Sequence, residues 1–275
     1  MAPKGVSIRF YGVRGSLPVP GPSTLRTGGN TSCVLYTAGD RKIILDCGSG
    51  MRVLANDLMA SGQPVRADVF ISHYHWDHMM GLPFFYPIYS PGTVLAIHGE
   101  RKEGLGVKDE VTKQFTGPNF PVERKDLRSK LTYDDIGPGD SLDLDEVHVE
   151  VVRLKHPNLC LGFRLEYRGT KVVYTTDHEH GTELDDGLIA FAQGADCLIY
   201  DQMYTKAEYE KSARGFGHSC WDEAVRVASA AGVGNLLLYH HDPNRDDDAV
   251  DAIEAEATRA FRGAIAAREG FEIEY

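Results

Sequence analysis

This sequence of 275 residues lacks the marks of several protein classes. Its five cysteines are scattered, odd in number and never spaced as C-x-x-C, which argues against a disulfide framework or a zinc ribbon. No run approaches the roughly 18 apolar residues of a membrane-spanning helix. The opening residues MAPKGVSIRFYG hold no apolar stretch typical of a secretory signal peptide. We therefore expect a cytoplasmic protein with no membrane partner.

Basic residues are also in short supply. Lys and Arg number 29 against 40 Asp and Glu, which gives a formal net charge of −11. Proteins that bind nucleic acid usually carry a basic face, and here acids interleave the basic stretches RKEGLGVK and VERKDLRSK. Net charge alone does not exclude a local basic patch, but the balance favours a small anionic substrate over a long polyanion.

Patterns of strands and helices alternate along the chain without an internal linker or a low-complexity tract. Turn residues predict hairpins at Gly39-Asp40 and at Gly169, each between two β-rich runs. Each half reads as strands first and then as alternating helices and strands. We expect a single α/β domain over residues 1–275, in which two similar layers share one core.

Apolar residues at helical spacing predict several helices. They are expected over residues 51–61, around 107–115, over 220–231 with Ser219 as the N-cap, and over 247–270. The last of these would place five apolar residues on one face: Val250, Ile253, Ala257, Phe261 and Ile265.

The stretch FISHYHWDHMMG crowds four ligand-type side chains directly after an apolar run. On a strand, His73 and His75 point the same way, and a helix that begins at about Trp76 turns Asp77 and His78 toward the same place. Imidazole nitrogens and carboxylate oxygens are ligands of divalent metals. The cluster therefore predicts a site for two metal ions, because solvated histidines in a polar loop are seldom packed so densely.

The segment HYHWDH resembles the H-x-H-x-D-H signature of the metallo-β-lactamase superfamily. The resemblance implies further ligands at strand ends in a set order, and the sequence offers them. His156 follows the strand pattern in RLKHP, Asp177 follows that in VVYTTDH, and His240 or His241 ends NLLLYHH. It also implies a four-layer αββα sandwich with a dinuclear metal site at the edge between the two sheets.

Further segments resemble the ribonuclease Z and cyclic phosphodiesterase branch of that superfamily. FYGVRGSLP and LRTGGNTSC are similar to its glycine-rich opening loop. ILDCGSGMR is similar to its D-x-G-x-G turn, where Asp46 would orient a metal-binding histidine. GFGHSCWDEAVRVA resembles its G-H-S element, which implies that His218 gives a proton to the leaving oxygen. Asp201 in LIYDQMY would hydrogen-bond to His218 and keep it protonated.

The resemblance implies two divalent ions, with zinc expected and manganese or iron as alternatives. Their expected ligands are His73, His75 and His156 for one ion, Asp77, His78 and His240 for the other, and Asp177 between both. A hydroxide shared by the ions would attack phosphorus. Besides binding a metal ion, Asp77 would accept the proton that the bridging water loses. LLLYHHDPNR fits the ribonuclease Z pattern L-x-H-x-S-x-R with His240 as the ligand, and His241 is the alternative. The backbone amides of the Gly28–Asn30 loop are expected close to the substrate.

The sequence also departs from ribonuclease Z. It has no clear counterpart of the arm that grips tRNA, and Asp242 stands where a serine usually follows the last ligand. We therefore predict a metal-dependent hydrolase, a phosphodiesterase for a small phosphodiester such as a cyclic nucleotide. The alternatives are a thiolester or lactone hydrolase of the same fold, a tRNA 3′-processing endoribonuclease that would take nucleic acid as partner, and a non-catalytic metal-binding sensor. A homodimer is compatible with the resemblance.

Overall fold

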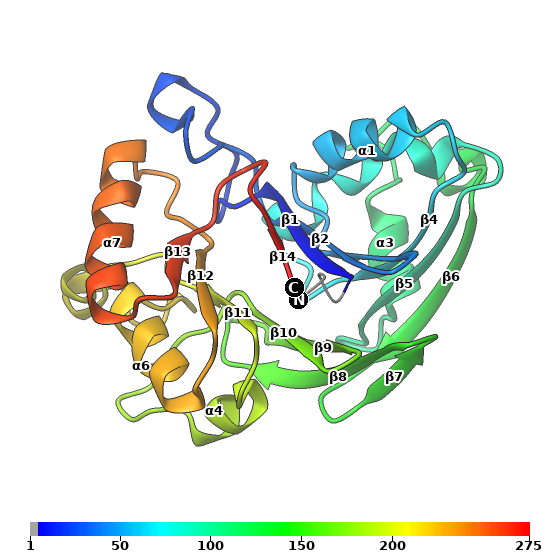
Figure 1. The fold of residues 1–275 in the computed structure, drawn as a ribbon. Helices are drawn as coiled ribbons and strands as arrows, with labels where there is room; N and C mark the ends of the chain where they lie inside the picture. The colour runs from blue at the N-terminus through cyan, green and yellow to red at the C-terminus, as the bar shows by residue number, and fades with distance from the viewer. Residues whose placement is uncertain (1–4) are drawn as a thin grey trace.

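The computed structural model describes residues 5–275 and contains two seven-stranded sheets that face each other (Figure 1). Helices cover the outer face of each sheet. This is the four-layer αββα sandwich that the sequence predicted. Among the described residues, no helix combines the length and the apolar character that crossing a membrane requires.

The first sheet contains the strands of the N-terminal half and the last strand of the chain. Its strands are Val6–Gly12 (β1), Cys33–Ala38 (β2), Arg41–Leu45 (β3), Arg66–Phe70 (β4), Val94–Glu100 (β5), Lys130–Ile136 (β6) and Glu272–Glu274 (β14). Their order in space is β14-β1-β2-β3-β4-β5-β6. The helices of this half are Met51–Ala60 (α1), Trp76–Met79 (α2) and Val107–Lys113 (α3).

The second sheet contains the remaining strands. They are Ser141–Leu144 (β7), Val147–Leu154 (β8), Cys160–Tyr167 (β9), Thr170–Thr175 (β10), Cys197–Asp201 (β11), Asn235–Tyr239 (β12) and Ala264–Ala266 (β13), in the spatial order β13-β12-β11-β10-β9-β8-β7. The helices of this half are Asp186–Ala192 (α4), Lys206–Glu208 (α5), Trp221–Ala231 (α6) and Asp247–Ala260 (α7). Short helical turns lie at Pro22–Thr24, Leu82–Phe84, Tyr86–Tyr89, Arg124–Asp126 and Tyr209–Ala213.

Both sheets follow the same plan, as the two similar halves of the sequence suggested. In the first sheet, β1 to β3 pair antiparallel and β3 to β6 pair parallel. In the second, β7 to β10 pair antiparallel and β10 to β13 pair parallel. Loops at the carboxyl ends of parallel strands are where α/β folds build their sites, and here both sheets contribute such ends.

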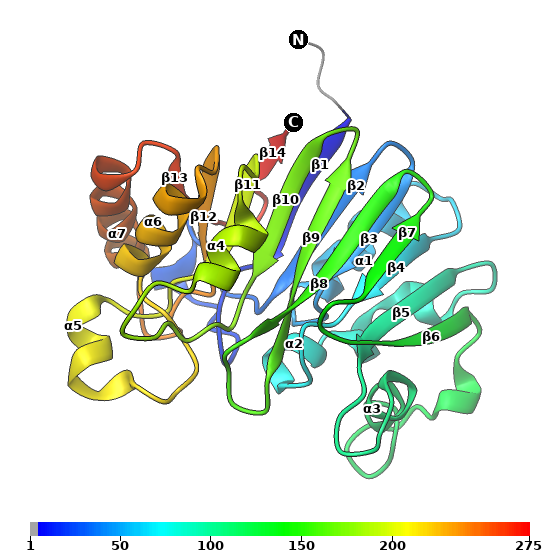
Figure 2. The ribbon, with the colours of Figure 1, turned by 90° about the horizontal axis from the view of Figure 1, so that it is seen from below.

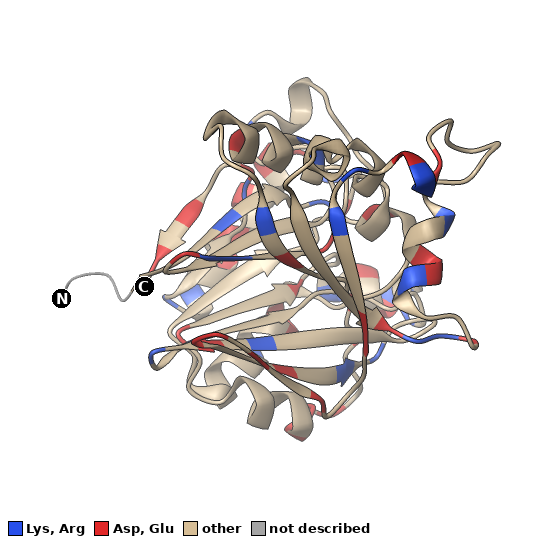
Figure 3. Cartoon of the chain, turned by 90° about the vertical axis from the view of Figure 1, so that its right-hand side faces the viewer, with Lys and Arg blue, Asp and Glu red and all other residues tan. Residues whose placement is uncertain are grey.

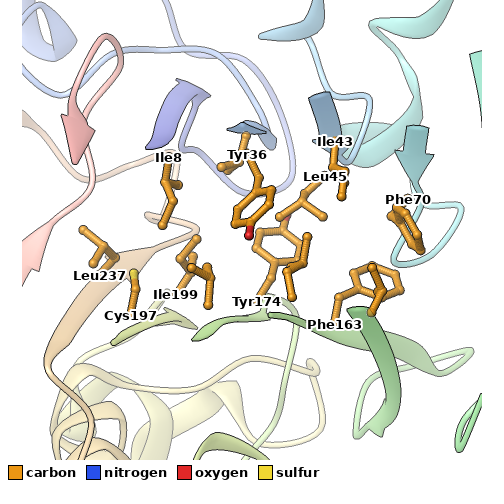
Figure 4. Close-up of a cluster of buried hydrophobic side chains, with 14 of the residues drawn as sticks. Ile8, Tyr36, Ile43, Leu45, Phe70, Phe163, Tyr174, Cys197, Ile199 and Leu237 are labelled. Atoms are coloured by element: carbon orange, nitrogen blue, oxygen red, sulfur yellow. The ribbon is translucent and has the colours of Figure 1, made fainter. Parts of the chain in front are cut away.

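The main core lies between the sheets (Figure 4). Ile8 and Tyr36 of the first sheet point toward Tyr174 and Leu237 of the second, and all four are fully buried. Because side chains alternate across a strand, the intervening residues face the helices. Two further clusters form there, one under α1 and α3 and the other under α4, α6 and α7.

Two helix boundaries differ from the sequence prediction. The N-cap of α6 is Cys220 rather than Ser219, whose hydroxyl instead meets Nδ1 of His180 at 2.8 Å. Helix α7 ends at Ala260, and the predicted continuous face through Ile265 is wrong, since Ile265 lies in β13 and pairs with β12. Strand pairing with a distant segment overrides the helical periodicity here.

Candidate active site

The predicted metal ligands lie where strands of both sheets end. His73 follows β4 of the first sheet, while His156, Asp177 and His240 follow β8, β10 and β12 of the second. The short helix α2 lies at the same edge (Figure 2) and supplies two more of these side chains. The structure thus brings together all seven residues in two groups that could hold metal ions.

The first donor group consists of His73, His75, His156 and Asp177, all but His75 buried. Oδ2 of Asp177 lies 3.5 Å from Nε2 of His73 and 3.5 Å from Nε2 of His156. Nε2 of His156 lies 3.1 Å from Nδ1 of His75. Four potential ligand atoms therefore converge on one point from three different loops.

The second donor group consists of Asp77, His78, Asp177 and His240, all buried. Nε2 of His78 lies 3.3 Å from Oδ2 of Asp77 and 3.3 Å from Oδ1 of Asp177. Nε2 of His240 lies 3.3 Å and 3.1 Å from the same two oxygens. Asp177 therefore turns one carboxylate oxygen toward each donor group, which is the arrangement of a bridging ligand.

The spacing of these atoms fits metal ions better than hydrogen bonds. Ligands 2.0–2.1 Å from a tetrahedral metal are about 3.3–3.4 Å apart, whereas nitrogen–oxygen hydrogen bonds cluster at about 2.9–3.0 Å. Nε2 of His73 and Nε2 of His78 are buried and have no hydrogen-bond partner among residues 5–275. Buried polar atoms rarely stay unpaired, and a bound divalent ion would satisfy both.

Most of these side chains are in the protonation state that binds metals. Burial lowers the pKa of His73 and of His75, and it lowers the pKa of His156 to about 4, so these imidazoles are neutral near pH 7. Burial alone would raise the pKa of Asp77 and Asp177, but the neighbouring histidines hold both well below the usual range. Neutral imidazole and ionised carboxylate are the ligating forms.

His78 is the exception among the donors. Burial lowers its pKa, but the surrounding carboxylates of Asp177, Asp77 and Asp46 outweigh burial and raise the pKa well above its ordinary value. In the absence of a cation His78 therefore carries a proton that balances this negative charge. A metal ion at the second donor group must displace that proton.

Asp46 fixes the orientation of His78 from the opposite side, as the sequence predicted. Its Oδ2 accepts hydrogen bonds from Nδ1 of His78 at 2.8 Å, from the Ser72 hydroxyl at 2.8 Å and from the Tyr174 hydroxyl at 2.7 Å. Its Oδ1 accepts the amide of Ser72 at 2.8 Å. Asp46 is fully buried at the end of β3, so this network holds the His78 ring with Nε2 toward the second donor group.

His218 and Asp201 form a buried pair beside both donor groups. Nδ1 of His218 donates to Oδ2 of Asp201 at 2.8 Å, as the sequence predicted. The His218 ring centre lies 4.9 Å from that of His240 and 5.1 Å from that of His156. Burial lowers the pKa of His218, but the Asp201 carboxylate outweighs it and raises the pKa to about 9. His218 therefore holds a proton at neutral pH and presents it on Nε2.

Glu179 was missed by the sequence reasoning. Its carboxylate accepts the amides of Gly215 at 2.6 Å and Gly217 at 2.9 Å and the hydroxyl of Tyr209 at 2.9 Å. The Gly217 carbonyl in turn accepts Nδ1 of His156 at 2.7 Å. Glu179 thus positions the loop that precedes His218 and, through that loop, a ligand of the first donor group. Its place two residues after Asp177 was the available signal.

His240 and His241 point to different places in the structure. Nε2 of His241 donates to the Ala267 carbonyl at 2.8 Å, and its Nδ1 meets the side-chain amide of Gln202. His241 therefore points away from the donor groups, and only His240 reaches them, as the better pattern match indicated.

Of the three backbone amides in the Gly28–Asn30 loop, two are engaged within the protein. The Gly28 amide donates to the Thr24 carbonyl at 2.8 Å and the Asn30 amide to the Glu269 carboxylate at 2.5 Å, so neither is free for a substrate. His98 and His148, which lie outside the donor groups, pair with carboxylates, at 3.1 Å to Asp68 and 2.6 Å to Asp143.

Known proteins resemble this chain along nearly its whole length. Residues 41–241 match the model of the beta-lactamase superfamily domain. Ribonuclease Z of Thermoplasma acidophilum is 26% identical over 98% of this chain and 96% of its own. The probable metallo-hydrolase YhfI of Bacillus subtilis is 28% identical over 88% of this chain and 91% of its own.

Solved structures show the same fold. The crystal structure of YhfI covers 98% of this chain and 99% of its own, with a TM-score of 0.74 at 23% identity. A diphosphatase of the PhnP family covers 98% of both chains, with a TM-score of 0.71 at 16% identity. With the two donor groups in place and the family model matched across both sheets, the chain belongs to the beta-lactamase superfamily and is a metal-dependent hydrolase of its ribonuclease Z-like branch.

Proposed function

We propose that this hydrolase cleaves small phosphodiesters, with cyclic nucleotides as the expected class. The observation that carries the proposal is the buried His218–Asp201 pair, which lies against both donor groups and keeps a proton at neutral pH. An alkoxide that leaves phosphorus is strongly basic and needs a proton from such a donor. A thiolate that leaves a thiolester needs none, so the pair has no evident use in a thiolester hydrolase.

The donor groups are proposed to hold two divalent ions. The proposed ligands are His73, His75 and His156 for the first ion, Asp77, His78 and His240 for the second, and Asp177 for both. Zinc is the expected metal because nitrogen and oxygen donors at tetrahedral spacing suit it, with manganese and iron as alternatives. When bound, the two ions would supply a water of lowered pKa and neutralise charge on the phosphoryl oxygens.

Asp77 has a proposed second role at the water that attacks phosphorus. Its Oδ2 accepts the Ser16 amide at 2.7 Å and faces His78 and His240, so the carboxylate is held in one orientation. From there it would take up the proton that the attacking water loses. Because the pKa of Asp77 is well below its usual range, that transfer would be transient, and the proton would pass on to solvent.

His218 is proposed to donate its Nε2 proton to the departing oxygen. The bond from phosphorus to that oxygen breaks as the proton arrives, so the leaving group departs as a neutral alcohol. Asp201 holds Nδ1 of His218 and stabilises the imidazolium before the transfer. Solvent then restores the proton to Nε2.

The charge distribution favours a small substrate over tRNA. The formal net charge is −11, and basic and acidic residues are interspersed along the elements drawn in Figure 3. Affinity for polynucleotides rests largely on basic side chains that contact phosphates. Cleavage of tRNA 3′ ends is the second candidate function, and the observation in its favour is the similarity to a ribonuclease Z over 98% of the chain.

The test is hydrolysis by the metal-loaded protein of bis-p-nitrophenyl phosphate, 2′,3′-cyclic AMP and a precursor tRNA. We expect both small esters to be cleaved, and we expect His218→Ala to lose most of its activity on 2′,3′-cyclic AMP. His148→Ala is the matched control, because His148 lies at the opposite end of β8 from His156. Cleavage of the precursor tRNA far above cyclic AMP would favour the second candidate. Inert phosphodiesters together with a cleaved thiolester or lactone would refute both.

A further inference from the structure

We propose that a hollow beside the first donor group binds the organic substituent of the phosphodiester, and that it takes an uncharged, planar group of nucleobase size. This inference rests on the proposed phosphodiesterase function. The hollow has a volume of about 500 Å³, and Tyr74, Lys102, Leu105, Asn158 and Leu159 are among its lining residues. We refer to it as the Tyr74 pocket.

The Tyr74 pocket adjoins the proposed ligands through the chain itself. Tyr74 lies between His73 and His75, and its hydroxyl donates to the Glu100 carbonyl at 2.6 Å, which directs the ring toward the end of β5. Asn158 follows His156 by two residues. The charge of Lys102, which lines the pocket, acts on the imidazole of His75, so these two residues lie near each other. The proposal places one substituent of the bound phosphodiester in this pocket.

Lys102 joins the two walls of the pocket. Its ammonium group donates to the carbonyls of Asn158 and Leu159 across from β5. Both of these residues have positive φ, 63° and 65°, which turns their carbonyls toward Lys102 and leaves their side chains at the pocket. The cation is thereby occupied in holding the wall and is not available to bind an anion.

Apart from Glu103, the other charged side chains around the pocket are also paired. Arg101 meets Asp135 at 2.5 Å, Lys113 meets Glu110 at 2.7 Å, and Glu100 accepts a hydrogen bond from Arg153 at 2.7 Å. An additional phosphate group in the pocket would find no unpaired cation among its lining residues. The electrostatics therefore favour a neutral ligand over an anionic one.

The remaining surface suits a flat, partly apolar ligand. Leu105 and Leu159 are 37% and 49% exposed, and they line the pocket together with Tyr74. The side-chain amide of Asn158, an exposed residue at the pocket, offers both a hydrogen-bond donor and an acceptor. A nucleobase has apolar faces for the leucines and a polar edge for this amide.

The experiment compares two substrates that release the same leaving group. Methyl p-nitrophenyl phosphate and thymidine 5′-(p-nitrophenyl phosphate) differ only in the other substituent of phosphorus. The variant is Leu159→Asn, because asparagine tolerates positive φ and so preserves the backbone while removing the apolar contact. The matched control is Leu25→Asn, since Leu25 is also an exposed leucine, at 80%, and is not among the residues that line the pocket.

We expect the wild type to prefer the thymidine ester, and Leu159→Asn to lower kcat/KM for that ester about tenfold, the loss of one buried leucine contact. Activity on the methyl ester and both activities of Leu25→Asn should stay unchanged. Cleavage of both esters with no effect of Leu159→Asn would overturn the pocket and leave the phosphodiesterase function standing. If neither ester is cleaved, calorimetric titration with thymidine decides: weaker binding by Leu159→Asn than by wild type supports the pocket, and equal binding or none overturns it.

Discussion

Replacing Asp201 by Asn tests the proton donor directly, because asparagine can still accept the hydrogen bond from His218 but carries no charge. In the wild type, burial lowers the pKa of His218 and the Asp201 carboxylate raises it to about 9. Without that carboxylate the pKa should return to about 6.5 or lower, since burial then dominates. The fall of about 2.5 in pKa corresponds to a roughly 300-fold loss of proton affinity. Bound cations would lower the pKa of His218 in both proteins, so the prediction concerns the difference in this pKa between the wild type and Asp201→Asn.

The sign of the effect follows from the role of His218. A proton donor works below its pKa, so activity is lost as the pH rises through that value. In Asp201→Asn the alkaline limb of kcat/KM for 2′,3′-cyclic AMP should lie about 2.5 pH units lower than in the wild type. Rates should be similar below both limbs and differ by up to about 300-fold above them. Bis-p-nitrophenyl phosphate is the control, because its leaving group needs little protonation. An alkaline limb at the same pH in both proteins would refute the reasoning.

Three further predictions concern the metal site. His240→Ala should lower zinc affinity of the second donor group by at least about tenfold in a competition titration, whereas His241→Ala should lower the melting temperature and leave zinc affinity unchanged. Asp46→Ala should cost about 3 kcal/mol in urea unfolding, since it leaves three buried partners unpaired, and intact stability would contradict the network at Asp46. Because the pKa of His78 is raised, zinc binding there should strengthen as the pH rises and release a proton in calorimetry. Affinity independent of pH would refute that last point.

Part of the donor set could be predicted from a local signal and the rest from the family resemblance. The H-x-H-x-D-H segment is contiguous, whereas the resemblance indicated His156, Asp177 and His240 as residues that follow strand patterns. Contacts between distant segments were not readable in the same way. Glu179 accepts hydrogen bonds from backbone amides 36 and 38 residues away. The sequence does not indicate which backbone amides a side chain will contact. The engagement of the Asn30 amide could not be predicted for the same reason, since the group that accepts its hydrogen bond is the distant Glu269.

The backbone at strand ends was also beyond sequence reasoning. Asp46, Asp177 and His240 have positive φ, between 58° and 62°, a conformation that non-glycine residues seldom adopt. It turns each side chain back toward the junction of the two sheets just after its strand ends. With regular strand geometry alone, the side chains of His240 and His241 would have been equally plausible at this junction.

Tyr174 belongs to the main core and to the metal site at once. Its ring is packed between the sheets, and its hydroxyl, from the second sheet, donates to Asp46 at the end of a strand of the first. Packing around the Tyr174 ring therefore affects the metal site. A methyl group added or removed next to this ring would shift Asp46 and thereby change the orientation of His78. Efforts to make this enzyme more heat-resistant by repacking its interior would thereby also retune its metal affinity. Tyr174→Phe separates the two effects, because it keeps the packing and removes only the link.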